Sequence, residues 1–142
     1  MPKLTTKLTR IDFRTLAEKR LREATKLFDA AQYDGAIYLS GYAVECALKA
    51  CIAKQTRQDE FPDKDTVNRS YTHVLIDLLG LAGHGLREQY DERMGEAVFT
   101  RDWALIGQWH EDDRYRSGAS GPEARDFIAA VQRIVDWIRP SW

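Results

Sequence analysis

The sequence predicts an all-α fold, an up-and-down helical bundle of about four long helices with one or two short ones. Apolar side chains recur every three or four residues along several segments, which is the period of an α-helix. No segment shows the sustained apolar–polar alternation of a strand. The link between the first two helical segments is short, so these helices are expected to pack as an antiparallel hairpin. A chain of 142 residues suits one domain.

The first helical segment begins at Asp12. Residues 1–11 are polar and lack periodicity, so they are expected to form a flexible arm. Residues 12–142 are assigned to a single domain. The first helix ends before a break at residues 32–35. The side chain of Asp34 is expected to accept a hydrogen bond from the backbone amides at the start of the next helix.

The second helix, residues 35–54, is the most informative segment. Between residues 36 and 53 its only charged side chains are Glu45 and Lys49. A helix that is apolar nearly all round is covered on nearly all sides, so it is either the central helix of the bundle or part of a subunit interface as well. A buried carboxylate needs a partner. We therefore expect a structural polar set of Glu45, Lys49 and Arg114, in which Arg114 holds a later loop against this helix.

The remaining chain alternates helical patterns with polar connections. Residues 55–70 form a polar loop, and Thr72 is expected to cap a short helix after it. Residues 86–98 carry a further helical pattern, and Thr100 is a candidate cap for the segment that follows. The last helix is preceded by Ser-Gly-Pro-Glu at residues 120–123, the pattern of a capping box. Its apolar face is expected to contain Ala124, Phe127, Ile128, Val131, Ile134, Val135 and Ile138.

Composition restricts the classes of function. The net charge is −1, so no global positive field attracts nucleic acid, although the first 30 residues are locally basic. Cys46 and Cys51 lie about 140° apart around one helix and cannot pair with each other, which favours a reducing compartment. No signal peptide and no membrane-spanning stretch is expected, so the sequence predicts a cytoplasmic protein.

The connection before the last helix is the candidate anion or nucleotide site. Arg114, Tyr115, Arg116 and Ser120 precede a helix N-terminus, where free amides and the helix dipole favour anions. A solvated loop is the alternative interpretation. Four aromatic residues can stack bases, but at helical spacing they are interpreted mainly as core: Trp103, Trp109, Tyr115 and Trp137.

Three stretches in order resemble the HEPN domain family. They are AQYDGAIYLSGYAVECALKA at residues 31–50, YTHVLIDLLGLAG at residues 71–83, and WHEDDRYRSG at residues 109–118. The resemblance covers about residues 12–138. It implies a helical bundle that often forms homodimers and associates with a nucleotide, with RNA, or with a partner nucleotidyltransferase. Many members are toxins that cleave RNA without a metal, through an arginine followed after four to six residues by a histidine.

The arginine–histidine motif is absent from this sequence. Three residues separate Arg69 from His73, eight separate Arg101 from His110, and no histidine follows Arg114. The resemblance therefore favours a non-catalytic binding module without cofactor or metal, and no catalytic residue is assigned. The alternative is a metal-independent ribonuclease in which folding brings Arg114 to His110 or His73. His73 by itself is interpreted as a capping or packing residue. A purely structural dimer is the third possibility.

Overall fold

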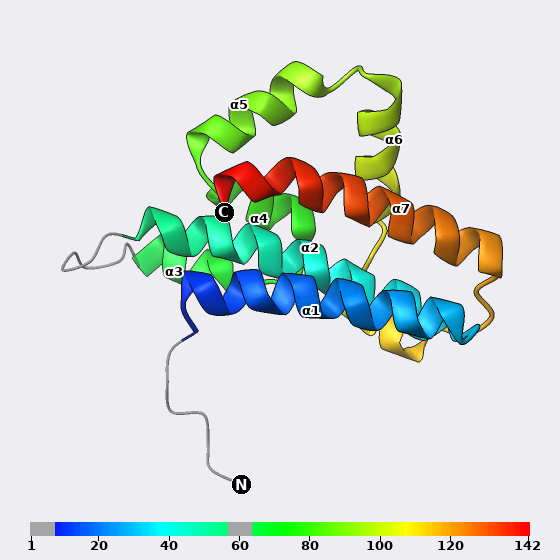
Figure 1. Ribbon diagram of the computed structural model, residues 1–142. Coiled ribbons are helices and arrows are strands. Elements are labelled where there is room, and N and C mark those ends of the chain that lie inside the picture. The colour runs from blue at the N-terminus through cyan, green and yellow to red at the C-terminus, as the bar shows by residue number, and fades with distance from the viewer. Residues whose placement is uncertain (1–7, 57–63) are drawn as a thin grey trace, which may run out of the picture.

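The computed structural model describes residues 8–56 and 64–142, and its described part is an all-α bundle, as predicted (Figure 1). Three helices are long, with 20, 23 and 18 residues. The elements are α1 (Arg10–Asp29), α2 (Tyr33–Gln55), α3 (Lys64–Ser70), α4 (Leu75–Leu81), α5 (His84–Arg93), α6 (Ala97–Ile106), the 3-10 helix η1 (Glu111–Tyr115), α7 (Gly121–Ile138) and the 3-10 helix η2 (Arg139–Ser141).

The α1–α2 hairpin differs from the prediction at both helix starts. The helix α1 begins at Arg10, two residues early, because the Thr9 side chain accepts a hydrogen bond from the Asp12 amide while the Asp12 carboxylate accepts one from the Thr9 amide. Most of the predicted arm, residues 1–7, lies outside the described residues. The N-cap of α2 is Gln32, whose side chain forms no capping hydrogen bond. Asp34 does not cap α2 as predicted, because its carboxylate accepts hydrogen bonds from backbone amides in the connection before α7.

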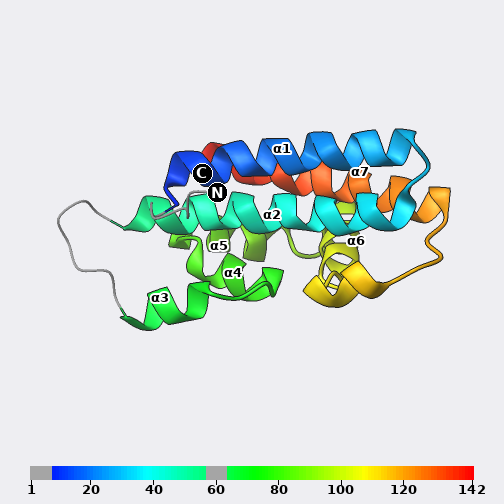
Figure 2. The same cartoon turned by 90° about the horizontal axis from the view of Figure 1, so that it is seen from below.

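The helix α2 is the centre of the bundle. In Figure 2 it lies between α1 and α7 on one side and α3 and α4 on the other. Its length and composition would allow it to cross a membrane, contrary to the sequence expectation. However, 72% of its most apolar window is buried inside the fold, as in the core helix of a bundle. This burial gives Glu45 and its neighbours a protein environment on almost every side.

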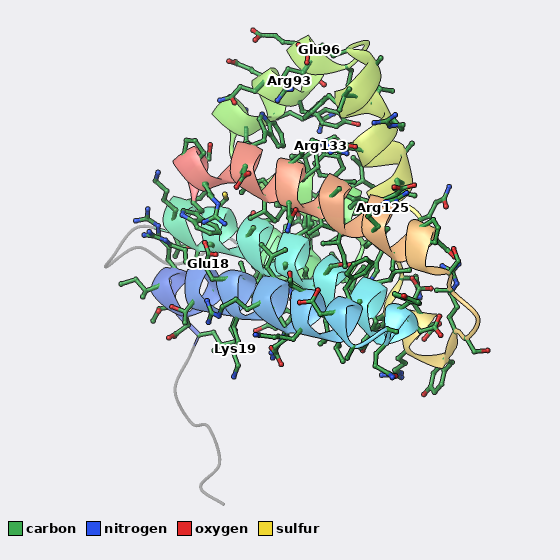
Figure 3. All side chains as sticks on the ribbon, turned by 45° about the vertical axis from the view of Figure 1, so that its right-hand side comes forward. Glu18, Lys19, Arg93, Glu96, Arg125 and Arg133 are labelled. Atoms are coloured by element: carbon green, nitrogen blue, oxygen red, sulfur yellow. The ribbon has the colours of Figure 1, made fainter. Side chains whose placement is uncertain are left out.

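Short helices replace a fourth long helix because glycines interrupt the chain. Gly83, with φ 117°, precedes α5, and Gly95, with φ 110°, separates α5 from α6. Arg93 donates to Glu96 over 3.0 Å across this second break (Figure 3). Thr100 does not cap α6 but lies within it, and its hydroxyl accepts a hydrogen bond from the Gly95 amide.

The helix α7 closes the bundle. Its predicted apolar face is buried throughout. Ser120 caps the helix by accepting a hydrogen bond from the Glu123 amide over 3.1 Å, but the Glu123 side chain turns away to Arg116, so the reciprocal half of the capping box is missing. Buried Asp102 on α6 accepts two hydrogen bonds, of 2.7 and 2.9 Å, from Arg133 on α7. This bidentate pair fixes the distance between the two helices.

Candidate functional site

A polar centre lies on the buried length of α2. Glu45 is 5% exposed, and its two carboxylate oxygens face different partners. One oxygen lies 3.6 Å from Lys49 Nζ, one turn along α2. The other lies 2.5 Å from Nδ1 of His73, in the connection between α3 and α4. Burial of this carboxylate is therefore offset by a cation and by a hydrogen bond.

His73 links three segments of the chain. Its Nδ1 faces Glu45 on α2, and its Nε2 lies 3.1 Å from Glu111 on η1. A neutral imidazole carries one N–H and can donate to one of these carboxylates, whereas the doubly protonated ring can donate to both. His73 is not the cap of α4, whose N-cap is Val74, but its ring packs edge-on against Tyr42 with the ring centroids 6.0 Å apart, which agrees with its interpretation as a packing residue. It holds η1 and the α3–α4 connection against the central helix.

The contact predicted between Glu45 and Arg114 is not formed. Within the described residues, Arg114 makes no ion pair with Glu45 but lies over the ring of Tyr115, 4.8 Å from its centroid. The physical reason is that Lys49 and His73 already occupy both oxygens of Glu45. A hydrogen bond with Tyr115 raises the pKa of Arg114, so this guanidinium stays charged at the surface. Tyr115 itself is 75% exposed.

The other residues of the predicted anion site already have partners within the same chain. Arg116 pairs with Glu123, and Ser120 is used as the cap of α7. The amides of Gly118 and Ala119 donate to the Asp34 carboxylate over 3.1 and 2.9 Å. The connection and the first turn of α7 are therefore already supplied with carboxylates, and among the described residues Arg114 and Tyr115 are the members of the predicted set that form neither an ion pair nor a helix cap.

An aromatic cluster borders the polar centre. The hydroxyl groups of Tyr38 and Tyr42 lie 3.2 Å apart on successive turns of α2. Trp109 packs edge-on against Tyr42, with ring centroids 4.9 Å apart, and its indole N–H donates to the Tyr38 carbonyl over 3.1 Å. Trp109 is 4% exposed, which agrees with its interpretation as core. The tyrosines are half-buried, so each shows part of its ring at the surface.

A groove between α1 and α2 gives access to these tyrosines. Burial, together with the hydrogen bond to Tyr38, raises the pKa of Tyr42, so its phenol remains a neutral hydroxyl. One cation lies at the groove, Arg20 on α1, which pairs with Glu23. Apolar walls with a few polar groups are typical of small-molecule sites. The groove is lined by Leu16, Arg20, Tyr38, Leu39, Tyr42 and Cys46.

The groove was not predicted from the sequence. Tyr38 and Tyr42 lie four residues apart on an apolar helix, a spacing that equally fits a core stripe. Only the packing of α1 against α2 shows that the two tyrosine rings line a surface groove. His73 and Glu111 were also visible in the sequence, but 37 intervening residues separate them, and only the folded chain brings them into contact.

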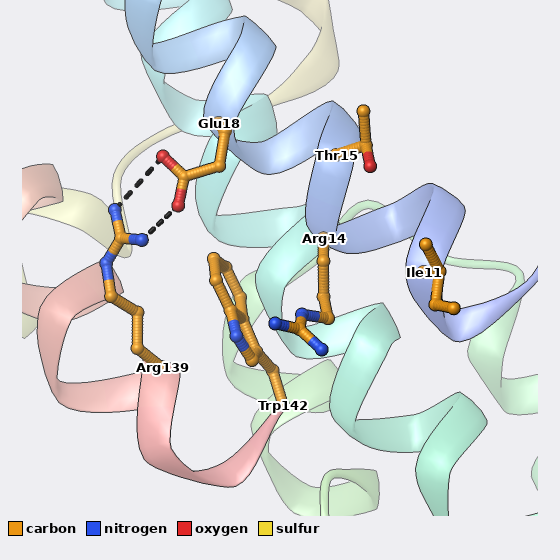
Figure 4. A pocket seen from close by; sticks show the side chains of 6 residues that line it. All are labelled: Ile11, Arg14, Thr15, Glu18, Arg139 and Trp142. Carbon is orange, nitrogen blue, oxygen red and sulfur yellow. Dashed lines mark hydrogen bonds and ion pairs between the residues drawn. The ribbon is translucent and has the colours of Figure 1, made fainter.

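A second cavity lies where the C-terminal end of α7 approaches α1 (Figure 4). Glu18 pairs with Arg139 across it, and this pair raises the pKa of Arg139. Arg14 lies over the indole of Trp142, 5.5 Å from the ring centroid. These contacts join η2 to α1, so we interpret them as closing the bundle. None of the site residues predicted from the sequence lines this cavity.

The fold and the site place the protein in the class of small helical-bundle domains, here with a buried glutamate bridged to a histidine beside a surface groove. The model of the HEPN domain family matches residues 12–140, and the chain belongs to this family. The chain matches no curated protein and no solved structure.

Proposed function

We propose that this HEPN domain is a non-catalytic binding module whose ligand is a nucleotide or an RNA segment. The observation that carries the proposal is the groove between α1 and α2, where two half-buried tyrosine rings lie near a guanidinium. Aromatic rings stack on any base because every base has a π-face, and arginine favours phosphate. Arg114 and Tyr115, exposed on η1, add a second cation and a ring for the ligand.

The absence of catalysis rests on the surroundings of the histidines. Transfer of protons around a 2'-hydroxyl needs a histidine within reach of the substrate, with a cation to stabilise the phosphate. His73 lies between the carboxylates of Glu45 and Glu111, which repel a phosphodiester. His110 uses Nδ1 to accept a hydrogen bond from the Asp112 amide. A ribonuclease built from Arg114 with either histidine remains the alternative that the first experiment must test.

That experiment incubates the purified protein with a mixed RNA pool in the presence of a chelator, and measures cleavage beside the variants Arg114→Ala, His73→Ala and His110→Ala. We expect no cleavage above that of a buffer control. Cleavage by the wild type that Arg114→Ala and one histidine variant both reduce would replace the binding module with a relocated ribonuclease site.

Binding is tested separately by calorimetric titration with ATP, GTP, CTP and UTP. We expect at least one nucleotide to bind, and Arg20→Gln to weaken that binding several-fold. Arg87→Gln is the control, since Arg87 is likewise a helix arginine with a carboxylate partner on its own helix, Asp91 at 3.5 Å, and lies away from the groove. Equal weakening by both variants, or no nucleotide binding at all, would remove the groove from the proposal.

A protein partner is the second candidate, favoured by one observation. Tyr71, Val74 and Ile76 are 83%, 42% and 46% exposed, and all three lie within three residues of His73. Exposed apolar side chains gathered in one segment are typical of protein interfaces. A second copy of the chain and a nucleotidyltransferase-type protein are the proposed occupants. Sedimentation of wild type and Tyr71→Ser/Ile76→Ser tests the homodimer.

We propose the cytoplasm as the compartment, because both cysteines are free.

A further inference from the structure

The outward face of α1 carries a line of cations that nothing else in the fold uses. Lys19, Arg22 and Lys26 are exposed, and within residues 8–56 and 64–142 none of them forms an ion pair. At 100° per residue these three positions fall within a sector of about 60°, and they extend over about 10.5 Å of helix axis. We call these three residues the cationic stripe. Figure 3 shows Lys19 extending from α1 away from the neighbouring helices.

The carboxylates nearest along α1 do not neutralise the stripe. Glu18 is held by Arg139 of η2, and Glu23 is held by Arg20 on the groove side of the helix. Each of these two acids is therefore paired with an arginine, and neither offsets the charge of the three cations. Asp29, one turn beyond Lys26, marks the C-terminal end of the stripe.

The surroundings of the stripe favour a nucleic-acid backbone over a protein. Protein interfaces are anchored by large apolar or aromatic side chains at their centre. Ile11, two turns before Lys19, is the only large apolar residue of α1 that is highly exposed. Cations without such anchors are what a phosphate backbone needs, because neutralising phosphates releases counterions and provides the affinity.

We propose that the cationic stripe of Lys19, Arg22 and Lys26 binds the sugar–phosphate backbone of single-stranded RNA. The inference rests on the proposed function in one respect: the strand is single because a base that stacks in the tyrosine groove must be unpaired. It deepens that function by making the ligand a polynucleotide that extends along α1, rather than a free nucleotide held in the groove alone.

The test uses the dependence of binding on salt. A fluorescein-labelled 12-nucleotide oligouridine is titrated with the full chain at 50, 100 and 200 mM NaCl, and binding is followed by fluorescence anisotropy. Three phosphate contacts on a single strand give a slope of about −2 in a plot of log K against log salt, or roughly a 20-fold loss of affinity over this range. We expect Lys19→Gln/Arg22→Gln/Lys26→Gln to flatten the slope by about 2.

The control removes the same charge elsewhere. Lys54, Lys64 and Arg101 are exposed on α2, α3 and α6, and their triple change to glutamine is expected to leave the slope unchanged. Glutamine has a helix propensity close to those of lysine and arginine, so the stripe variant should fold, as far-ultraviolet circular dichroism can verify. Should it not, Lys19→Gln/Lys26→Gln is expected to flatten the slope by about 1.4.

The outcomes separate the two proposals. Loss of oligouridine affinity in the stripe variant, with nucleotide binding retained, supports the inference. An unchanged slope in the stripe variant, combined with weakened binding in Arg20→Gln, overturns the stripe and leaves the groove standing. Failure of the wild type to bind oligouridine also overturns the stripe, and the nucleotide titration then decides the groove independently.

Discussion

Replacing Gly41 by alanine is expected to destabilise the domain, although alanine favours helices. A Cβ atom built at Gly41 lies 2.1, 2.2 and 2.3 Å from three atoms of the Trp109 indole. Carbon atoms pack at about 3.5 Å or more, so the indole must move by roughly 1.4 Å. That movement breaks its 3.1 Å hydrogen bond to the Tyr38 carbonyl. Because Trp109 also packs on Tyr42, the change should reach the groove.

The size of the effect follows from three contributions. Overpacking of a buried site costs about 1–3 kcal/mol, and the lost hydrogen bond costs about 1 kcal/mol. Alanine returns about 1 kcal/mol through its helix preference. The expected net loss is about 1–3 kcal/mol in the free energy of unfolding, measured by urea denaturation and circular dichroism.

Gly80→Ala is the matched control for this prediction. Gly80 lies in helix α4 and is exposed, and the nearest atom to its added Cβ is Arg87 Nη1 at 3.7 Å, an ordinary contact. This variant should gain about 0.5–1 kcal/mol. If Gly41→Ala were as stable as Gly80→Ala, Trp109 would not be packed against α2 as described.

Three further predictions concern buried polar groups. His73→Ala should cost about 1–3 kcal/mol in urea denaturation, because it leaves a buried oxygen of Glu45 without its donor; a loss below 0.5 kcal/mol would contradict the bridge. Arg133→Ala leaves the buried carboxylate of Asp102 unpaired and should lower the free energy of unfolding by about 2–3 kcal/mol. This loss is below the full value for a buried pair because Arg133 is half-exposed. The double variant Arg133→Ala/Asp102→Asn should recover part of the loss. Burial raises the pKa of the Cys46 thiol to about 11, so its thiolate fraction at pH 8 is roughly one thousandth. Iodoacetamide should therefore label it at least about 100-fold more slowly in the native state than in urea, and faster as pH rises; rapid native labelling would refute the burial.

Much of the fold followed from the sequence because its causes are local. Helical periodicity located α1, α2 and α7 to within a few residues, and the near-absence of charge on α2 identified it as the central helix. The helix boundaries differ from the prediction, since caps depend on which side chain turns back to which amide. Asp34 illustrates this: its type and position suit a cap, yet its carboxylate accepts from amides more than 80 residues away.

The candidate site depended far more on tertiary structure. The sequence by itself determined that Glu45 is buried, that it needs a partner, and that Lys49 lies one turn away, because these statements concern one helix. Only the tertiary structure decided that the further partner is His73 and not Arg114, and that Arg116 is held by Glu123. The physical reason is that several donors of similar chemistry were available to each carboxylate. Which of them comes within 3 Å is set by the packing of whole helices, and no local pattern in the sequence records that distance.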